Sequence, residues 1–409
     1  MKLLLLLPYS PIPTNTGNKN LTFNLLKYLE KKYSVDIIIF ENLNKKEVNF
    51  SKIIKRAYPN IKNIYIFERN KGLNLYFYKI YFLLQGLHPA LGNYYRFKVA
   101  KWINLNSNMY DLVHFDMFLV SPYINSIKNK PTLLVSSDAY TLAATLAMKN
   151  LNNFFEKINI NFQKILLANL ESLFYKKFTK IVCVSNIDKD YLTSKLKLKN
   201  IISIGIPIAE KLRKREINHH NKILGKNSEI KLLITGSLNH NVIAKNITSF
   251  IKNVVPNILN KHKNLEIFIL GKSPTDFLQK EIDKNINIKH IEFVEDYFEF
   301  LDNDWIYIYP QKCATGLQTK LQQALASGLP VLAYEVSCGG LYLTHKKNAF
   351  IIKEEKDFFN YIDKLIENPK LRKKIGKAAL EHIQLNYSIN KIGKKYTGVY
   401  EKIIKKANP

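Results

Sequence analysis

A lysine beside a small-residue loop is the part of this sequence best suited to chemistry. The loop at residues 313–316 reads CATG, and Lys320 lies in the first turn of the helical pattern that follows it. Backbone amides at a helix start attract anions, and a lysine there adds a full positive charge. The pair therefore predicts a diphosphate site. The alternative is that Gly316 eases a turn and that Lys320 is a solvated surface lysine.

The elements that must position this loop make one strand–loop–helix–strand unit. An aromatic and β-branched run, Trp305–Tyr309, predicts a buried strand that ends at Pro310. Apolar residues at 321, 324 and 325 share one helical face, and residues 328–330 (GLP) end that helix. The apolar run Val331–Val336 predicts the next strand. A loop in this place lies at the edge where open parallel sheets bind ligands.

The same alternation of strands and helices runs through both halves of the chain. It predicts an α/β fold with two doubly wound parallel sheets. The expected strands of the first half are Lys2–Leu7, Val35–Phe40, Ile61–Phe67, Leu112–Phe115, Pro131–Ser136 and Lys180–Val184, with a helical pattern from Asn20. The second half repeats the plan with strands at Ile230–Thr235, Leu265–Leu270 and His290–Val294, and with helical patterns at Ile247–Leu259, Tyr297–Leu301, Glu355–Glu367, Pro369–Leu385 and Ile389–Lys406.

Length and composition predict where these two halves are divided. A chain of 409 residues is long for one domain, so two domains are expected. Residues 209–229 are polar and basic and lack apolar periodicity, which is typical of a linker. The predicted organisation is an N-terminal domain at 1–207, a linker at 208–229, a C-terminal domain at 230–386 and a C-terminal helix at 387–409.

The formal charge of +29 arises from 62 Lys and Arg against 33 Asp and Glu. Only six of the basic residues are arginines, and lysine cannot copy the bidentate contact of arginine with guanine. No specific nucleic-acid partner is therefore expected. Genomic base bias and attraction to an anionic membrane surface both explain the lysine excess. The segment Leu73–Leu84 is either a membrane-facing amphipathic helix or a plain core helix.

Segment lengths and cysteine spacing indicate the compartment. No apolar run approaches the roughly 20 residues that span a bilayer. The Leu3–Leu7 run is expected to be a buried strand rather than a signal peptide. Cys183, Cys313 and Cys338 have neither disulfide nor metal spacing. We expect a cytoplasmic protein, with peripheral attachment to the inner face of the cytoplasmic membrane as the second possibility.

The order of these features resembles the GT-B glycosyltransferases of glycosyltransferase family 4 (group 1). In that family a proline-ended strand leads to a small-residue loop, a lysine, an "EA-small-A-x-G-x-P-V" helix and strand, and a Gly-rich turn. The resemblance covers nearly the whole chain. Its matching positions are Pro8, Pro11, Gly17, Glu171, 178–185, Asp188, 236–238, 271–274, 294–296, 300–301, Pro310, Gly316, Lys320, 323–326, Gly328, 330–331, 339–341 and 387–388.

This resemblance implies a GT-B architecture, in which two Rossmann-like domains face a central cleft. It also implies metal-independent transfer of a sugar from a nucleotide diphosphate with retention of the anomeric configuration. Lys320 would stabilise the leaving diphosphate, helped by amides of the Thr315–Leu317 loop and of Gly17 across the cleft. Lys245 would assist from the other donor loop or is a solvated helix lysine. The implied donor-binding residues are Gly17, Gly236, Ser237, Lys245, Glu295, Thr315, Gly316, Leu317, Gln318 and Gln323.

Three of these positions depart from the family pattern. Gln323 stands where a glutamate usually accepts hydrogen bonds from the donor ribose, and its amide oxygen accepts such bonds without the charge. Thr315 replaces an acidic residue near the sugar ring, and Gln318 replaces an arginine. These exchanges leave the identity of the donor sugar nucleotide open.

Two strand ends of the first half supply acceptor-side candidates. Asp138 follows the Pro131–Ser136 strand, and His114 stands at the end of Leu112–Phe115. Either suits acid–base work or contact with a sugar hydroxyl, although such a histidine is alternatively a satisfied structural residue. Residues 302–304 (DND) precede a strand rather than follow one, so they predict a turn and no metal site.

The leading hypothesis is a retaining glycosyltransferase that uses a UDP- or GDP-sugar and a glycan or lipid-linked acceptor. Its expected setting is bacterial-type surface polysaccharide assembly, such as lipopolysaccharide or capsule. The nucleotide sugar is a co-substrate, and no cofactor is expected. The alternatives are a nucleotide-sugar epimerase of the same fold, which needs no acceptor, and a catalytically weakened nucleotide- or glycan-binding subunit.

Overall fold

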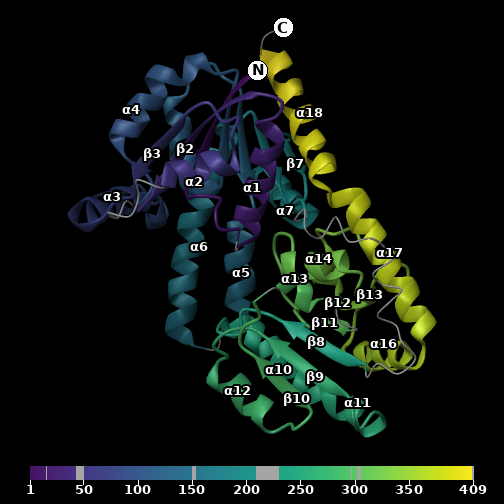
Figure 1. Ribbon diagram of the computed structural model, residues 1–409. Coiled ribbons are helices and arrows are strands. Elements are labelled where there is room, and N and C mark those ends of the chain that lie inside the picture. Colours follow the sequence, from purple (N-terminus) through teal and green to yellow (C-terminus); the bar gives the residue numbers. More distant parts are fainter. Residues whose placement is uncertain are drawn as a thin grey trace. The chain divides into compact units, whose positions relative to one another are not determined.

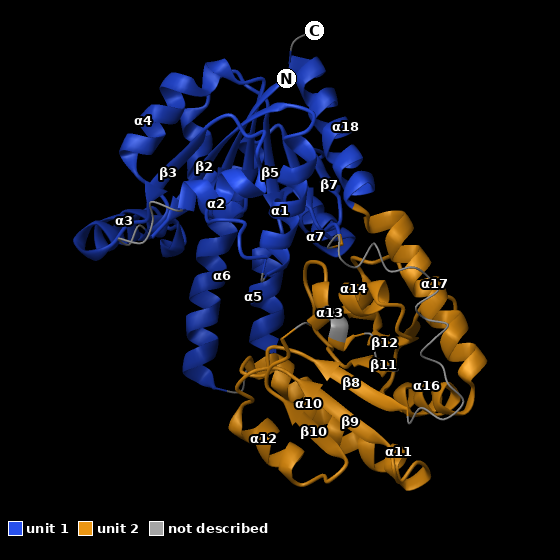
Figure 2. Ribbon diagram, in the orientation of Figure 1, with its two compact units in different colours: residues 1–207, 389–409 blue, residues 208–388 orange. Residues whose placement is uncertain are grey.

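The computed structural model describes residues 1–14, 16–42, 50–149, 153–208, 230–295, 297–301 and 305–407 (Figure 1). The chain forms two compact units, with Met1–Pro207 and Ile389–Pro409 in unit 1 and Ile208–Ser388 in unit 2 (Figure 2). The expected linker residues 209–229, the DND sequence at 302–304 and Asp296 lie outside the described residues. Ile208 belongs to unit 2, where its amide donates to the carbonyl oxygen of Tyr387 at 2.9 Å.

Unit 1 is built on a parallel sheet with the strand order β3-β2-β1-β4-β5-β6-β7. Its strands are β1 (Lys2–Leu7), β2 (Ser34–Glu41), β3 (Ile64–Glu68), β4 (Leu112–Asp116), β5 (Thr132–Ser136), β6 (Lys180–Cys183) and β7 (Ile201–Ser203). Its helices are α1 (Gly17–Leu29), α2 (Phe50–Ala57), α3 (Gly72–Leu84), α4 (Phe97–Asn106), α5 (Tyr140–Lys149), α6 (Phe154–Phe174), α7 (Asn186–Leu196) and α18 (Ile389–Ala407), with short 3₁₀ segments at Pro89–Asn93, Ser107–Met109, Phe118–Ser126 and Tyr175–Lys177.

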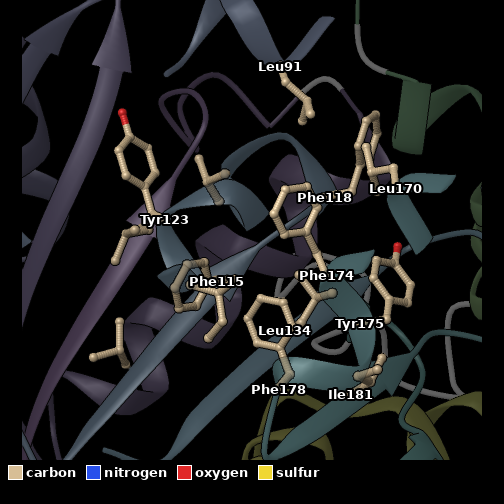
Figure 3. Close-up of a cluster of buried hydrophobic side chains, with 14 of the residues drawn as sticks. Leu91, Phe115, Phe118, Tyr123, Leu134, Leu170, Phe174, Tyr175, Phe178 and Ile181 are labelled. Carbon is tan, nitrogen blue, oxygen red and sulfur yellow. The ribbon is translucent and has the colours of Figure 1, made fainter. Parts of the chain in front are cut away.

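The core of unit 1 lies between this sheet and its helices. Strand β1 is buried on both faces, because leucines occupy all positions from 3 to 7, and Leu5 pairs with both Ile37 and His114. Aromatic rings fill the space beside it (Figure 3), with the rings of Phe115 and Phe178 centred 4.9 Å apart. Near-continuous apolar strands of this kind are the mark of a parallel sheet that is covered on both faces.

The last helix of the chain, α18, completes unit 1. It packs along α1, where Gly393 lies so close to the ring of Tyr28 that a Cβ atom would be 2.4 Å from it. Tyr396 and Tyr400 of α18 are fully buried. The helix therefore contributes core side chains to a sheet whose strands come from the other end of the chain.

Unit 2 is built on a second parallel sheet, in the order β10-β9-β8-β11-β12-β13. Its strands are β8 (Lys231–Thr235), β9 (Glu266–Leu270), β10 (Ile288–Ile291), β11 (Trp305–Tyr309), β12 (Val331–Tyr334) and β13 (Phe350–Ile352). Its helices are α10 (Asn241–Asn253), α11 (Val255–Lys261), α12 (Asp276–Asp283), α13 (Tyr297–Phe300), α14 (Thr319–Ala326), α15 (Glu335–Cys338), α16 (Glu355–Glu367) and α17 (Pro369–Tyr387).

The two sheets confirm the predicted α/β fold with two doubly wound, Rossmann-like units. Several boundaries differ from the prediction. The helix expected at Ile247–Leu259 is two helices, α10 and α11, because proline stands at the second position of α11. The strand expected at Val331–Val336 ends at Tyr334, where α15 begins. Strands β7 and β13 were not predicted, since each has only three residues.

Within the described ranges, every helix is too short or too polar to cross a bilayer.

Candidate functional site

Each sheet has one place where the strand order reverses. In unit 2 this switch point lies between β8 and β11, and in unit 1 it lies between β1 and β4. Ligands of open parallel sheets bind outside the carboxyl ends of the strands at such points, because the loops there diverge to opposite faces. The candidate residues of each unit are therefore expected at its own edge of this kind.

The loop after β11 is shaped by glycines. Gly316 has a backbone φ of +64°, a left-handed conformation that a side chain would strain. Gly340, after α15, presses on this loop, and a Cβ atom there would lie 3.2 Å from the Cα atom of Leu317. Leu317 is buried beneath the loop. The predicted small-residue loop is thus in close backbone contact with the glycine turn that follows α15.

The side chain of Gln318 stabilises the same loop through two hydrogen bonds. Its side-chain oxygen accepts from the Tyr309 hydroxyl at 2.7 Å, and its side-chain nitrogen donates to the carbonyl oxygen of Thr315 at 2.7 Å. Gln318 is also the residue that precedes the first turn of α14. Because its side chain is engaged with Tyr309 and Thr315, Gln318 acts as a loop support. Its predicted contact with a donor stays a prediction.

A buried amide fixes the start of the same loop. Gln311 is 4% exposed, and its side-chain oxygen accepts from the amide of Asn246 in α10 at 2.9 Å. Its backbone carbonyl accepts from the hydroxyl of Ser337 in α15 at 2.8 Å. The loop is thereby tied to helices on either side of β11, which pre-organises its backbone.

Lys320 lies in the first turn of α14, as predicted, and it is partly buried. Its ammonium group stands 5.2 Å from the centre of the Tyr297 ring. Burial lowers the pKa of Lys320, because a desolvated ammonium is less stable. A lysine with few waters around it binds a phosphate more strongly than an exposed one, since less hydration is lost on contact.

Tyr297 connects Lys320 to the end of β8. The Tyr297 hydroxyl lies 3.4 Å from the hydroxyl of Thr235, which in turn lies 2.6 Å from the hydroxyl of Tyr307. Thr235 is the last residue of β8, directly before Gly236. The structure thus brings Lys320 and the Gly236 turn to one edge of unit 2. Sequence reasoning missed Tyr297, which it treated only as a helix start.

The Gly236 turn is packed against the glycine turn that follows β9. A Cβ atom on Gly271 would stand 2.3 Å from the carbonyl oxygen of Gly236 and 2.7 Å from the side chain of Leu238. The Gly236 amide donates to the carbonyl oxygen of Leu270 at 3.1 Å. The path of the turn therefore depends on the absence of a side chain at position 271.

We expect Gly271→Ala to displace the Gly236 turn, because the new methyl group meets backbone rather than a flexible side chain. The substitution should lower the free energy of unfolding by about 1–3 kcal/mol, the usual cost of overpacking, and weaken nucleotide binding. Urea denaturation and nucleotide titration measure the two effects. Gly398→Ala in α18 is the matched control, since its methyl group would enter open space. Equal behaviour of both variants would contradict the proposed packing.

The other donor-side candidates have partly buried or exposed side chains. Gln323 is partly buried and one turn beyond Lys320 on α14, so both side chains share a helix face. Ser237 is exposed beside Gly236, and Lys245 is exposed in the second turn of α10. Glu295 is exposed in the segment after β10. Their roles toward a donor stay predictions.

At the switch point of unit 1, the loop after β1 leads into α1. The helix begins at Gly17, three residues before the predicted start, and Thr16 caps it by accepting from the amide of Lys19 at 3.3 Å. Gly17 thus stands at a helix start, as a phosphate-binding glycine would, and its contact with a donor stays a prediction.

Asp116 is a buried carboxylate at this edge that sequence reasoning missed. It is the last residue of β4, and only 3% of it is exposed. Its Oδ2 atom accepts from the hydroxyl of Thr22 in α1 at 2.6 Å. Burial raises the pKa of Asp116 to about 7, and the Thr22 hydrogen bond opposes this shift. The carboxyl group therefore changes charge near neutral pH. An acid directly after an apolar strand was the signal that could have found it.

The residue after Asp116 has an unusual backbone. Met117 has a φ of +77°, a region that non-glycine residues adopt rarely and mostly at sites the surrounding structure holds in place. Its sulfur accepts from the Tyr9 hydroxyl at 2.6 Å and lies 3.6 Å from the side-chain amide of Asn18. Loops after β1 and β4 therefore meet at Met117.

His114 lies away from this edge, and its acceptor-side role stays a prediction. It stands in the middle of β4, 2% exposed, and its Nδ1 atom lies 2.6 Å from the hydroxyl of Tyr400. Burial lowers its pKa to about 3, so the imidazole is neutral at physiological pH. The histidine joins β4 to α18, an arrangement that favours the structural alternative.

Asp138 lies two residues after β5 and is partly buried. Its backbone carbonyl accepts from the Ser136 hydroxyl at 2.8 Å, and the following amide, of Ala139, donates to Asp188 at 2.8 Å. The turn that carries Asp138 is thus fixed by buried polar groups. Its acceptor-side role stays a prediction.

Across the described segments, no group of three or more His, Cys, Asp or Glu residues is placed to hold a metal ion.

Known proteins similar to this chain were found by sequence. Residues 229–368 match the family model described as "Glycosyl transferases group 1". The chain is 27% identical to an uncharacterized glycosyltransferase of Haemophilus influenzae over 329 residues, which cover 75% of this chain and 88% of that protein. It is 23% identical over 177 residues, 42% of this chain and 43% of the relative, to a UDP-N-acetylglucosamine–N-acetylmuramyl-(pentapeptide) pyrophosphoryl-undecaprenol N-acetylglucosamine transferase of Natranaerobius thermophilus.

Solved structures share the fold. Anabaena HepE in complex with UDP aligns with a TM-score of 0.63 and 13% identity, over 98% of this chain and 100% of that one. Staphylococcus aureus TarM aligns with a TM-score of 0.67 and 14% identity, over 98% and 99% of the two chains. At these identities the likeness concerns the fold alone.

Proposed function

We propose that this chain, whose residues 229–368 match the group 1 glycosyltransferase model, catalyses a retaining transfer of a sugar from a UDP- or GDP-sugar. The acceptor we propose is a glycan or lipid-linked hydroxyl in surface polysaccharide assembly. In this reaction the bond between the anomeric carbon and the diphosphate oxygen breaks, and the diphosphate keeps the electron pair. The acceptor oxygen then bonds to the anomeric carbon and loses its proton.

The observation that carries this proposal is the edge of unit 2 at Lys320. A fixed loop, the start of α14 and a partly buried lysine meet there, beside the Gly236 turn. Charge that builds on a leaving diphosphate is stabilised best by donors that are already in place, because no reorganisation is needed during the reaction. Lys320 supplies the positive charge, and the loop amides at 315–317 supply donors.

Asp116 in unit 1 supports an acceptor-side role. A carboxylate whose pKa lies near 7 is suited to accept a proton from a hydroxyl at neutral pH. It stands at the ligand-binding edge of its own sheet. We propose Asp116, in place of His114, as the group that orients or deprotonates the acceptor hydroxyl.

We place the reaction in the cytoplasm. A reducing compartment keeps buried thiols such as those of Cys183 and Cys338 reduced.

Incubation of the protein with a panel of UDP- and GDP-sugars, with and without glycan and lipid-linked acceptors, tests the function. We expect nucleotide release that depends on one donor and increases with acceptor. Nuclear magnetic resonance of the product should show the anomeric configuration of the donor. Consumption of donor with epimer formation and no need for acceptor would instead identify an epimerase.

A nucleotide-binding subunit with little turnover is the second candidate. It is favoured by Gln323 and Thr315, which offer neutral contacts at positions where relatives of this type carry acids. Tight binding of UDP or GDP without turnover across the whole panel would support it.

A further inference from the structure

One face of helix α3 in unit 1 is apolar and open to solvent. The exposed fractions are 88% for Leu73, 65% for Tyr76, 55% for Phe77, 55% for Ile80 and 83% for Leu84. Their spacing places them on one side of the helix. Single exposed apolar residues are common, but a continuous stripe on a helix marks an interaction surface. Figure 1 shows α3 at the outer margin of unit 1.

The opposite face of α3 is already packed, so the exposed stripe is not needed for the fold. The ring of Tyr81 stacks with that of Tyr95 at 6.4 Å, and the rings of Tyr78 and Phe97 are centred 5.6 Å apart. Phe82 is buried in the core of the unit. The segment therefore has a core face and an apolar outer face, and its contact with a membrane stays a prediction.

Helix α6 carries a second row of exposed apolar residues. The side-chain amide of Asn169 in α6 donates to the carbonyl oxygen of Gly86, two residues after α3, at 3.0 Å. This bond places the end of α3 beside the carboxyl-terminal third of α6. Exposed apolar residues follow one side of α6 at Phe154, Phe155, Ile158, Phe162, Ile165 and Leu173. We call the exposed apolar residues of α3 and α6 together the α3–α6 surface.

The sequence around α3 is basic, although Lys71 pairs with Glu68 at 3.0 Å and Arg69 pairs with Glu41 at 3.5 Å. From Arg69 to Tyr110 the sequence contains no acidic residue. The same segment contains six basic residues, at Arg69, Lys71, Lys79, Arg96, Lys98 and Lys101. Lys98 and Lys101 are exposed on α4, the helix that begins at Phe97 beside α3. An apolar stripe bordered by lysines is the composition of helices that lie in a membrane interface.

We propose that the α3–α6 surface docks unit 1 on an anionic lipid bilayer. The apolar side chains enter the boundary between headgroups and acyl chains, and the lysines contact lipid phosphates. A second copy of this chain is a poor occupant, because it would bring two positive surfaces together. This inference goes beyond the proposed transfer, and vesicle binding tests it without donor or acceptor.

Co-sedimentation with vesicles of phosphatidylcholine, alone or mixed with phosphatidylglycerol, is the test. We expect binding to the mixed vesicles that exceeds binding to the neutral ones and falls as salt is added. The pair Leu73→Asp and Leu84→Asp should lower binding about tenfold or more, since two apolar anchors are lost. The pair Lys98→Glu and Lys101→Glu should lower binding to the mixed vesicles alone, by at least about fivefold per removed lysine.

Matched controls lie in unit 2. Ile286→Asp alters a side chain that is 95% exposed, and Lys263→Glu reverses an exposed lysine, so both should leave vesicle binding unchanged. Thermal unfolding of each variant checks that the fold is kept. The proposal is wrong if the wild-type protein ignores mixed vesicles at low salt. It is also wrong if the α3 pair leaves binding unchanged, or changes only the oligomeric state in lipid-free buffer.

Discussion

Lys320→Ala is expected to lower kcat by about 10²–10³-fold, the usual cost of removing one pre-organised group that stabilises a developing negative charge. The lysine is partly buried at the start of α14, where its ammonium group contacts the Tyr297 ring. A water molecule that fills the space left by the side chain carries no charge, so it cannot replace the ammonium group. Steady-state rates of nucleotide release with the preferred donor measure this effect.

The control for this experiment is Lys280→Ala, which removes an exposed lysine from α12 of the same unit. It should keep the wild-type rate. Lys320→Arg keeps the charge but changes the shape of the donor, so its activity should lie between those of the wild type and the alanine variant. Circular dichroism distinguishes loss of chemistry from loss of fold. A Lys320→Ala variant with near wild-type turnover would remove this residue from the mechanism.

Asp116→Asn is expected to abolish a pH dependence of the transfer reaction with a midpoint near 7. In the wild type, burial holds the pKa of Asp116 at about 7, so the group ionises as the pH rises through neutrality. If the carboxylate accepts the proton of the acceptor hydroxyl, the rate rises over the same interval. The asparagine variant should be about 10²-fold slower above the midpoint, with a flat profile. The exposed acid Asp190, replaced by asparagine, is the control.

Thr22→Val provides a second readout for the same site. The Thr22 hydroxyl donates to the Asp116 carboxylate and so lowers its pKa against the effect of burial. Valine has nearly the same shape but cannot donate. The midpoint of the pH–rate profile should therefore move to higher pH in this variant. A midpoint that stays in place would show that another group controls the profile.

The same pKa shift predicts the pH dependence of stability. The folded protein holds the Asp116 proton up to about pH 7, whereas an unperturbed aspartate loses it near 3.8. Between these values the folded state binds more protons than the unfolded chain, so stability falls as the pH rises and levels off above about 7. The full effect of this raised pKa on stability is about 4 kcal/mol at most. Asp116→Asn should flatten this part of the urea-denaturation profile.

Sequence patterns predicted the sheets well because parallel strands that are covered on both faces are nearly continuous apolar runs. Trp305–Tyr309 and the leucines of β1 are examples, and their bounds agree with the structure. Short edge strands such as Phe350–Ile352 escaped detection, since three residues carry too little periodicity. The helix break before Val255 was also missed, although Pro256 was present as a signal.

The candidate site was only partly predictable, because burial and hydrogen-bond partners depend on packing between distant segments. The loop glycine and Lys320 follow from local order along the chain. The choice between His114 and Asp116 does not, since both lie in one strand and only the structure places the histidine against Tyr400 of α18. The engagement of Gln318 with Tyr309 was likewise invisible in sequence, because it depends on the path of the loop.

The closure of unit 1 by α18 has a consequence for synthesis on the ribosome. All of unit 2, Ile208–Ser388, is translated before the helix at Ile389–Ala407 leaves the exit tunnel. Until then, His114 lacks its Tyr400 partner and the face of unit 1 that α18 covers stays open to water. Unit 2 is continuous in sequence, so its folding does not depend on a segment that is translated later. The amino-terminal domain usually folds first, but here the final folding step belongs to unit 1. The incomplete unit 1 is therefore the part of the nascent chain that chaperones would have to shield.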